Sequence, residues 1–194
     1  LQSGKEVFYL SYEEIPKEVI TAMIVTEDKK YFAHKGVDYM ANLRAAYSLV
    51  KHKGTIYQGG STITQQLARN IYLTNEQTYA RKITEIFLAA ELEKRYSKND
   101  ILEYYLNNIY FANGYYGIQA AAHGYFSRGV AELSFSELMF LCAIPNNPSL
   151  YDPYEHFEDT LARRDSVMEQ MYHDGKLDRE QYLEACREEI VLCP

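Results

Sequence analysis

The sequence predicts a mainly α-helical protein, and two observations support this fold class. Apolar residues recur at three- and four-residue spacings in several segments, and these segments open with capping boxes, in which Ser, Thr or Asp precedes Glu, Gln or Asp by three positions. Alternation of apolar and polar residues, which marks a half-buried strand, is scarce, and residues 6–10 are its one weak candidate. With 194 residues, of which 47% are hydrophobic, the chain can form one domain with a sizeable core.

The expected helices follow one another along the chain. The first opens at Ser11-x-x-Glu14, has Pro16 in its first turn and continues through position 27. The later helices open at Thr74-x-x-Gln77, Ser97-x-x-Asp100, Ser134-x-x-Glu137 and Asp178-x-x-Gln181. The helix after Ser134 contains the apolar run from Leu138 to Ile144, and we expect it to stop at Pro145, because the residue before a proline disfavours helical backbone.

Two stretches are predicted to lie outside these helices. Residues 51–61 (KHKGTIYQGGS) contain three glycines, which predicts a mobile loop. Residues 113–117 (NGYYG) predict a tight turn between two helices.

The composition excludes several classes of protein. Lys and Arg number 20 against 27 Asp and Glu, and the resulting charge of −7 disfavours a general affinity for nucleic acid. The three cysteines form neither a C-x-x-C pair nor a metal-ligand spacing, which argues against a disulfide scaffold or a zinc site and leaves their redox state open. The 19 tyrosines suit surfaces that are half apolar and half wet, such as sugar-binding clefts or membrane interfaces.

No apolar run is long enough to span a membrane, and the chain begins at Leu1 without a signal-peptide pattern. We therefore expect a domain excised from a longer protein.

Glu27 is the most informative single residue. It follows three apolar residues at helical spacing, namely Ile20, Met23 and Ile24. This periodicity places a carboxylate on the apolar face of the first helix, where desolvation penalises the charged form and favours general acid or base chemistry. The alternative is that Glu27 lies at the edge of the stripe and reaches solvent or pairs with a neighbouring lysine.

Two polar segments follow Glu27 in the sequence. Asp28 and His34 come first, and His34 taken alone favours a structural role. The segment from Gly59 to Gln66 (GGSTITQQ) is dense in small and polar groups. Its paired glycines allow close approach of the backbone, and its hydroxyls and amides can bind phosphate or sugar oxygens. A flexible loop that runs into a polar helix start explains this segment equally well.

A cluster of cations forms the last candidate. Arg81 and Glu85 share a helix face, and Lys82 lies three residues before Glu85. A salt-bridged surface helix would explain this spacing, but Arg69 adds a further cation twelve residues earlier. Several cations near two carboxylates indicate a site for a phosphorylated substrate, in which the cations bind phosphate and a carboxylate moves a proton.

In their order and spacing these motifs resemble the peptidoglycan glycosyltransferase (transglycosylase) family, which includes domains of class A penicillin-binding proteins and monofunctional transglycosylases. The family motif ED-x-x-F-x-x-H-x-G-[VF]-D matches residues 27–38, and GGSTITQQ is unbroken at residues 59–66. R-K-x-x-E matches residues 81–85, K-x-x-ILE-x-YLN matches residues 98–107, and a looser fifth region covers residues 116–126. The resemblance covers nearly the whole chain.

The chain departs from the family pattern at four positions. Tyr31 stands where the family usually has Phe, and Arg69 stands where some members have Lys. Ala112 and Ser127 replace frequent glycines. None of these changes affects Glu27 or Glu85.

The resemblance implies a lysozyme-like helical fold with a large lobe and a small, membrane-facing jaw lobe at roughly residues 39–58, all within a single domain, 1–194. The local sequence of the jaw agrees, because an apolar stripe beginning at Met40 is accompanied by several basic residues. It also implies a location at the extracytoplasmic face of the bacterial plasma membrane, through an anchor outside this chain. Whether a transpeptidase domain follows in the parent protein is left open.

The activity implied is polymerisation of lipid II into β-1,4-linked glycan, with inversion and release of undecaprenyl pyrophosphate. Glu27 would be the general base. Glu85 would either orient the cations or hold a divalent metal, Mg or Mn, and the sequence does not choose between these roles. Lipid II and the growing glycan would be held by a set of substrate-binding residues: Asp28, His34, Ser61, Thr62, Gln66, Arg69, Asn70, Arg81 and Lys82.

Two other functions are compatible with the sequence. A lysozyme-like peptidoglycan hydrolase would also use a lone glutamate in a helical fold, although a neutral glycosidic bond offers no phosphate to the cations. A non-catalytic module that binds lipid-linked glycan would leave Glu27 without a chemical role.

Overall fold

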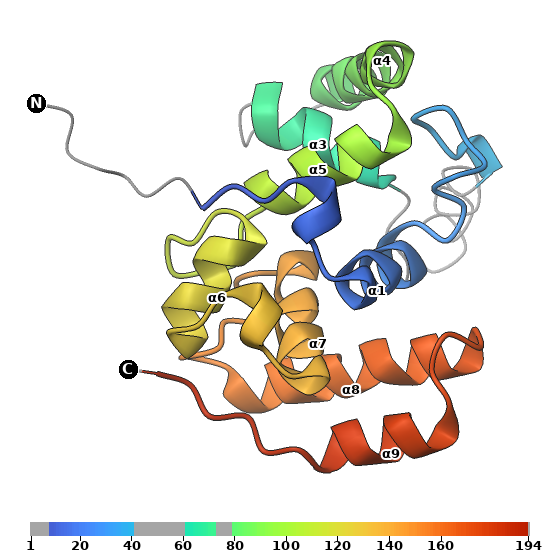
Figure 1. Ribbon diagram of the computed structural model, residues 1–194. Helices are drawn as coiled ribbons and strands as arrows, with labels where there is room; N and C mark the ends of the chain where they lie inside the picture. The colour runs from blue at the N-terminus through green and yellow to red at the C-terminus, as the bar shows by residue number, and fades with distance from the viewer. Residues whose placement is uncertain (1–7, 41–60, 73–78, 194) are drawn as a thin grey trace, which may run out of the picture. The chain divides into compact units, whose positions relative to one another are not determined.

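The computed structural model describes residues 8–40, 61–72 and 79–193 (Figure 1). Within these ranges the protein is helical, without a strand, and an isolated bridge pairs Tyr110 with Tyr116. The α-helices are α1 (Lys17–Glu27), α3 (Ile63–Tyr72), α4 (Tyr79–Arg95), α5 (Lys98–Asn108), α6 (Ile118–Phe126), α7 (Phe135–Ala143), α8 (Phe157–His173) and α9 (Arg179–Arg187). Short 3-10 turns lie at η1 (Tyr12–Glu14), η2 (Val130–Glu132) and η3 (Ile144–Asn146). The predicted fold class is confirmed.

Three predicted features fall wholly or largely outside the described residues. They are the capping box at Thr74-x-x-Gln77, the glycine-rich loop at 51–61 except for Ser61, and nearly all of the jaw segment at 39–58. The lysozyme-like arrangement of lobes therefore stays a prediction. The weak strand candidate is not confirmed, because residues 8–10 are described and are not in a strand.

The capping boxes that the structure describes set the helix starts, with one correction. Both the amide and the hydroxyl of Ser11 donate to Oε2 of Glu14, at 2.8 and 2.7 Å, but this box closes the 3-10 turn η1. Helix α1 starts only at Lys17, directly after Pro16, whose carbonyl accepts the first helical hydrogen bonds. The prediction that Ser11 opens the long helix was therefore wrong by one turn, because the proline's fixed φ separates the two elements.

The chain forms two compact units, residues 1–22 with 106–194 and residues 23–105. In the first unit, α7 packs against α8, and α9 returns alongside α8 (Figure 1). Helix α7 is buried on all sides from Ser136 to Ala143, which is typical of a helix at the centre of a core. It begins at Phe135 and gives way at Ile144 to the 3-10 turn η3, which contains Pro145, so the predicted stop lies within one residue of its true position.

Arg164 of α8 connects three helices of the first unit through hydrogen bonds. Its guanidinium is buried and donates to Oγ of Ser136 at 3.0 Å and to the carbonyl of Glu188 at 3.2 Å. It also pairs with Asp165 at 2.8 Å. Because a buried guanidinium is stable only when its donors are satisfied, this residue fixes α7 and the end of α9 to α8.

The three cysteines are free thiols in the structure. Cys142 lies on the buried helix α7, and burial raises the pKa of its thiol to about 12. At neutral pH this thiol stays protonated and acts as a small apolar side chain.

The tight turn predicted at residues 113–117 is confirmed. Ala112, Asn113, Gly114 and Gly117 all have positive φ, and the amide of Gly117 donates to the carbonyl of Ile109 at 2.9 Å. A Cβ atom on Gly117 would lie 2.5 Å from the carbonyl oxygen of Asn107, whereas a Cβ on Gly114 would meet nothing within 4 Å. Glycine is therefore required at position 117 for space as well as for conformation.

Replacing Gly117 with alanine is expected to destabilise the protein by about 3 kcal/mol, because strain at positive φ adds to a backbone clash. Gly114→Ala is the matched control, since it introduces the same strain without the clash and should cost about 1 kcal/mol. Thermal unfolding of the two variants measures the difference. Equal losses would show that the backbone at Asn107 moves aside freely.

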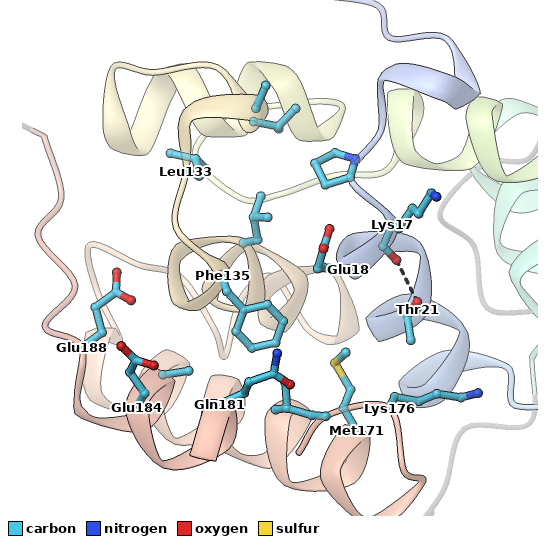
Figure 2. Close-up of a pocket in the computed structure, with 16 residues that line it drawn as sticks. Lys17, Glu18, Thr21, Leu133, Phe135, Met171, Lys176, Gln181, Glu184 and Glu188 are labelled. Carbon is cyan, nitrogen blue, oxygen red and sulfur yellow. Dashed lines mark hydrogen bonds between the residues drawn. The ribbon is translucent and has the colours of Figure 1, made fainter. Parts of the chain in front are cut away.

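A cavity of about 650 Å³ lies in the first unit among α1, the η2–α7 segment, α8 and α9 (Figure 2). Phe135 and Met171 contribute to its apolar wall, and Lys17, Lys176 and Glu184 lie around it. No residue of the predicted site lines this cavity.

The second unit packs α3 against α4 and buries an apolar core that includes Met23, Ile63, Leu67, Ala89 and Leu102. The loop after α1 approaches α4 closely at Gly36, which has a φ of 89° and where a Cβ would lie 2.8 Å from the carbonyl oxygen of Ala89. The capping box that opens α5 is present as predicted, since the amides of Ser97 and Asp100 each bond to the other residue's side chain.

Candidate active site

All the predicted site residues lie in the second unit, and all fall within the described ranges. They come from three places in the chain: the end of α1 with the loop after it, the start and length of α3, and the first turns of α4. The fold therefore brings together segments that are about 20 to 60 residues apart in the sequence.

Glu27 is the last residue of α1. The apolar stripe that precedes it is buried at Ile20 and Met23, while Ile24 and Glu27 itself are half-buried. Oε2 of Glu27 accepts a hydrogen bond from Nε2 of Gln66, on α3, at 3.1 Å. Of the two arrangements that the sequence left open, the carboxylate thus takes the edge of the stripe, where it is held by an amide and remains accessible.

Asp28 is buried and anchors the start of α3. Its carboxylate accepts from the amide of Ile63 at 3.0 Å and from Nε2 of His34 at 2.8 Å. Nδ1 of His34 accepts from the amide of Gly36 at 3.1 Å, so the ring hydrogen lies on Nε2 and is directed to Asp28. A carboxylate at a helix N-terminus satisfies free amides and matches the positive end of the helix dipole.

His34 and Asp28 therefore form one structural unit next to Glu27. The pair connects the loop that follows Glu27 to the segment that carries the GGSTITQQ motif. Both side chains bond within the protein in this structure, and the substrate-binding role assigned to them from the sequence stays a prediction.

Thr62 caps α3 through a capping box that the sequence reasoning missed. The amide of Thr62 donates to Oε1 of Gln65 at 2.9 Å, and the amide of Gln65 donates to the hydroxyl of Thr62 at 3.1 Å. The same hydroxyl donates to the carbonyl of Gly36 at 2.6 Å. Thr62 is buried and its hydroxyl is used within the protein, so in this structure it is a cap. The pattern Thr62-x-x-Gln65, hidden inside the longer motif, was the signal that identifies this cap.

The cations of α4 surround a buried carboxylate. Glu85 has a side-chain exposure of 1% and pairs with Nζ of Lys82 and, at 3.6 Å, with a guanidinium nitrogen of Arg81. Lys82 also donates to Oγ of Ser61 at 2.8 Å, which joins α4 to the GGSTITQQ motif. Because Glu85 is buried, the alternative of an ordinary surface salt bridge is wrong.

The cluster places two cations on one buried carboxylate. One carboxylate serves two cations, and the Lys82 side chain keeps an exposure of 37%. A buried carboxylate is stable only when it is well paired, so Glu85 holds both cations in fixed positions next to each other.

The remaining two predicted residues lie further along α3. Arg69 is half-buried in the last turn of the helix and Asn70 is exposed. The structure thus gathers two groups within this unit, one around Glu27 with Gln66, Asp28 and His34, and one around Glu85 with Arg81, Lys82 and Ser61.

The residues described do not by themselves fit a metal site. In ranges 8–40, 61–72 and 79–193 no three His, Cys, Asp or Glu side chains gather so as to hold an ion. Glu85 is already paired with two cations. These contacts are the ones that an orienting role for Glu85 requires, and a metal at Glu85 stays a prediction.

The chain belongs to the transglycosylase family, whose pattern matches residues 1–172. Penicillin-binding protein 4 of Bacillus subtilis is 45% identical over 93% of this chain and 29% of its own length. Penicillin-binding protein 1A of Aquifex aeolicus is also 45% identical, over 95% of this chain and 25% of its own length. A crystal structure of penicillin-binding protein 1A from Haemophilus influenzae is 27% identical and aligns with a TM-score of 0.47 over 68% of this chain and 16% of that chain.

The protein is therefore a glycosyltransferase, and its domain is of the peptidoglycan glycosyltransferase type. The predicted resemblance is confirmed. The chain spans between a quarter and a third of the length of these curated relatives. Among the helices that the structure describes, none is long and apolar enough to cross a membrane.

Removal of the Asp28 carboxylate is expected to loosen the start of α3. Asp28→Ala leaves the amide of Ile63 and the ring N–H of His34 without their buried acceptor, which should cost about 3 kcal/mol. Asp178→Ala is the control, because it removes an exposed cap of α9 and should cost about 1 kcal/mol. Denaturant unfolding compares the two, and hydrogen exchange at Ile63 should accelerate only in Asp28→Ala. An unchanged exchange rate at Ile63 would contradict the anchoring role.

Proposed function

We propose that this domain polymerises lipid II into β-1,4-linked glycan strands. The observation that carries the proposal is the cation cluster on Glu85, which holds the positive charges of Arg81 and Lys82 side by side, as binding of a diphosphate requires. Glu27, in the same unit, supplies a half-buried carboxylate that can accept a proton. Family membership supports the pairing of these two groups in one reaction.

The proposed chemistry is a single displacement with inversion. The 4-hydroxyl of the acceptor sugar attacks the anomeric carbon of the donor, whose bond to the pyrophosphate oxygen breaks. The hydroxyl proton passes to Glu27, and the bonding electron pair leaves with undecaprenyl pyrophosphate. Because an α-linked donor gives a β-linked product, one inversion accounts for the stereochemistry without a covalent enzyme intermediate.

The cations act where negative charge develops. Arg81 and Lys82 would bind the donor's phosphates, with Arg69 as a third cation on α3, and would stabilise the leaving pyrophosphate. Ser61, Gln66 and Asn70 would line the donor cleft. Glu85 would act through the cations that it positions, and a divalent metal at Glu85 stays a prediction.

The proposed substrates and location follow from the chemistry of lipid II. Its undecaprenyl chain stays in the bilayer, so we propose that the domain works at the extracytoplasmic surface of the plasma membrane, held there by an anchor in the parent protein. Exposed Tyr39 and Met40, at the start of the predicted jaw, support a membrane-facing segment. The relatives are penicillin-binding proteins several times longer than this chain, which supports a further, penicillin-binding domain in the parent.

The test of this function is an assay with two substrates. Labelled lipid II in liposomes should give a ladder of glycan strands when the protein is added, and purified mature cell wall should release no new reducing ends. Release of reducing ends without a ladder would favour the lysozyme-like hydrolase. Binding of lipid II without either product, both in this chain and in the membrane-anchored parent, would favour the non-catalytic module.

A further inference from the structure

Tyr105 of α5 contacts the side-chain amide of Gln66, which holds Glu27. The sequence motifs gave Tyr105 no role of its own. Its side chain is completely buried, and its hydroxyl donates to Oε1 of Gln66 at 3.0 Å. Nε2 of the same amide donates to Oε2 of Glu27 at 3.1 Å. Three elements, α5, α3 and α1, are thus connected by a chain of two hydrogen bonds that ends on the proposed general base.

The two hydrogen bonds fix which way the Gln66 amide faces. An amide has one accepting and one donating end, and a carboxylate can only accept. If the amide were reversed, its oxygen would face the Glu27 carboxylate and repel it, and the carboxylate would lose a donor. The Tyr105 hydroxyl stabilises the observed orientation because it supplies a donor to the amide oxygen.

The rigidity of this arrangement comes from burial. Tyr105 is held in the core of the second unit by neighbours on its own helix, Ile101 and Leu102, which are also fully buried. Its hydroxyl therefore has a fixed position, whereas a glutamine side chain alone has several rotamers. The hydrogen bond from the buried Tyr105 hydroxyl therefore restricts the rotamers of the half-buried Gln66 side chain at the edge of the site.

We propose that Tyr105 is a positioning residue for the reaction, acting through Gln66 to hold the Glu27 carboxylate toward the acceptor hydroxyl. The inference rests on the proposed role of Glu27 as general base. Tyr105 does not touch the reacting atoms, and its effect is on the orientation of the base. A misplaced base slows proton transfer without weakening the binding of the donor, whose phosphates are held by the separate cluster on Glu85.

The first test is Tyr105→Phe, which removes one oxygen atom and keeps the ring. We expect kcat for lipid II polymerisation to fall about tenfold with KM unchanged, which is the effect of losing one oriented hydrogen bond. Tyr31→Phe is the matched control. Tyr31 is also fully buried in this unit, and its hydroxyl donates to the carbonyl of Lys98 at 2.7 Å, away from Glu27. Tyr31→Phe also introduces the residue that the family usually has, and it should keep full kcat.

The second test removes the intermediate group. Gln66→Met should lower kcat at least as much as Tyr105→Phe, and Tyr105→Phe introduced into Gln66→Met should lower it by less than a further twofold, because the tyrosine acts only through the amide. Gln66→Met with an unchanged kcat would overturn the inference even if Tyr105→Phe failed to fold. A full tenfold loss from Tyr105→Phe in the Gln66→Met background would also overturn it, since the effect would then not pass through Gln66.

The experiment separates this inference from the proposed function. If the native protein makes no glycan from lipid II, the proposed function fails and the tyrosine variants have no activity to compare. If the native protein is active and Tyr105→Phe matches Tyr31→Phe in kcat, the inference fails while the proposed function stands. Melting temperatures of both variants show whether a loss of kcat reflects a loss of folded protein.

Discussion

Glu27→Gln is expected to abolish glycan polymerisation while leaving the fold and the binding of lipid II intact. Glutamine has nearly the same shape as glutamate but cannot accept the acceptor's proton, and removal of a general base slows such reactions by about 10²–10⁴-fold. The Gln66 amide, which now donates to Glu27, would meet an amide and can still form a hydrogen bond. Glycan ladders from labelled lipid II measure the loss, and a binding assay with the same lipid shows that the site is retained.

Glu18→Gln is the matched control for this variant. Glu18 lies on the same helix, α1, but in its first turn and exposed, so the same chemical change should leave polymerisation unaffected. Turnover by Glu27→Gln at the native rate would exclude Glu27 as the base. A loss of lipid binding in Glu27→Gln together with its turnover would instead assign Glu27 to substrate binding.

Lys82→Met is expected to lower kcat for polymerisation by about 10²–10³-fold. Lys82 is fixed by Glu85 and by Ser61 and remains partly exposed, so it is placed to stabilise the leaving pyrophosphate, and removal of one such electrostatic group typically has this effect. The loss of a phosphate contact should also raise KM for lipid II. The variant keeps Arg81 as the partner of Glu85, which limits the cost of leaving that carboxylate buried.

The control for Lys82→Met is Lys94→Met on the same helix. Lys94 pairs with Glu91 at 2.6 Å, also three residues apart, but this pair is exposed and belongs to no predicted site. Lys94→Met should keep the native kcat and change stability by less than about 0.5 kcal/mol. Equal activity of the two variants would contradict the assignment of Lys82 to the diphosphate.

Helix boundaries were the features most readily predicted from the sequence. The boxes at Ser97, Ser134 and Asp178 depend only on hydrogen bonds between residues three positions apart, and the structure has each of them. The box at Ser11 was assigned to the wrong element, because Pro16 separates the 3-10 turn from α1. A local pattern thus identifies a cap reliably but does not say how long the element after it will be.

Burial was harder to predict than position. The spacing of Arg81, Lys82 and Glu85 predicted a shared helix face, and this is confirmed. Whether that face was exposed could not be read from the spacing, because it depends on the packing of α3 against α4. Glu27 shows the same limit, since Ile20 and Met23 of its stripe are buried but Glu27 itself lies half-buried at the end of the helix.

The sequence by itself determined the helical class and the family and indicated the candidate site residues, because residue types, their periodicity and their order are properties of the chain. Only the tertiary structure decided which of those residues meet. Asp28 caps α3 from 35 positions away, and Gln66 reaches Glu27 across 39 positions. Tyr105, a further 39 positions along, orients that amide. Such contacts form when distant segments are packed into one core, so no local spacing encodes them.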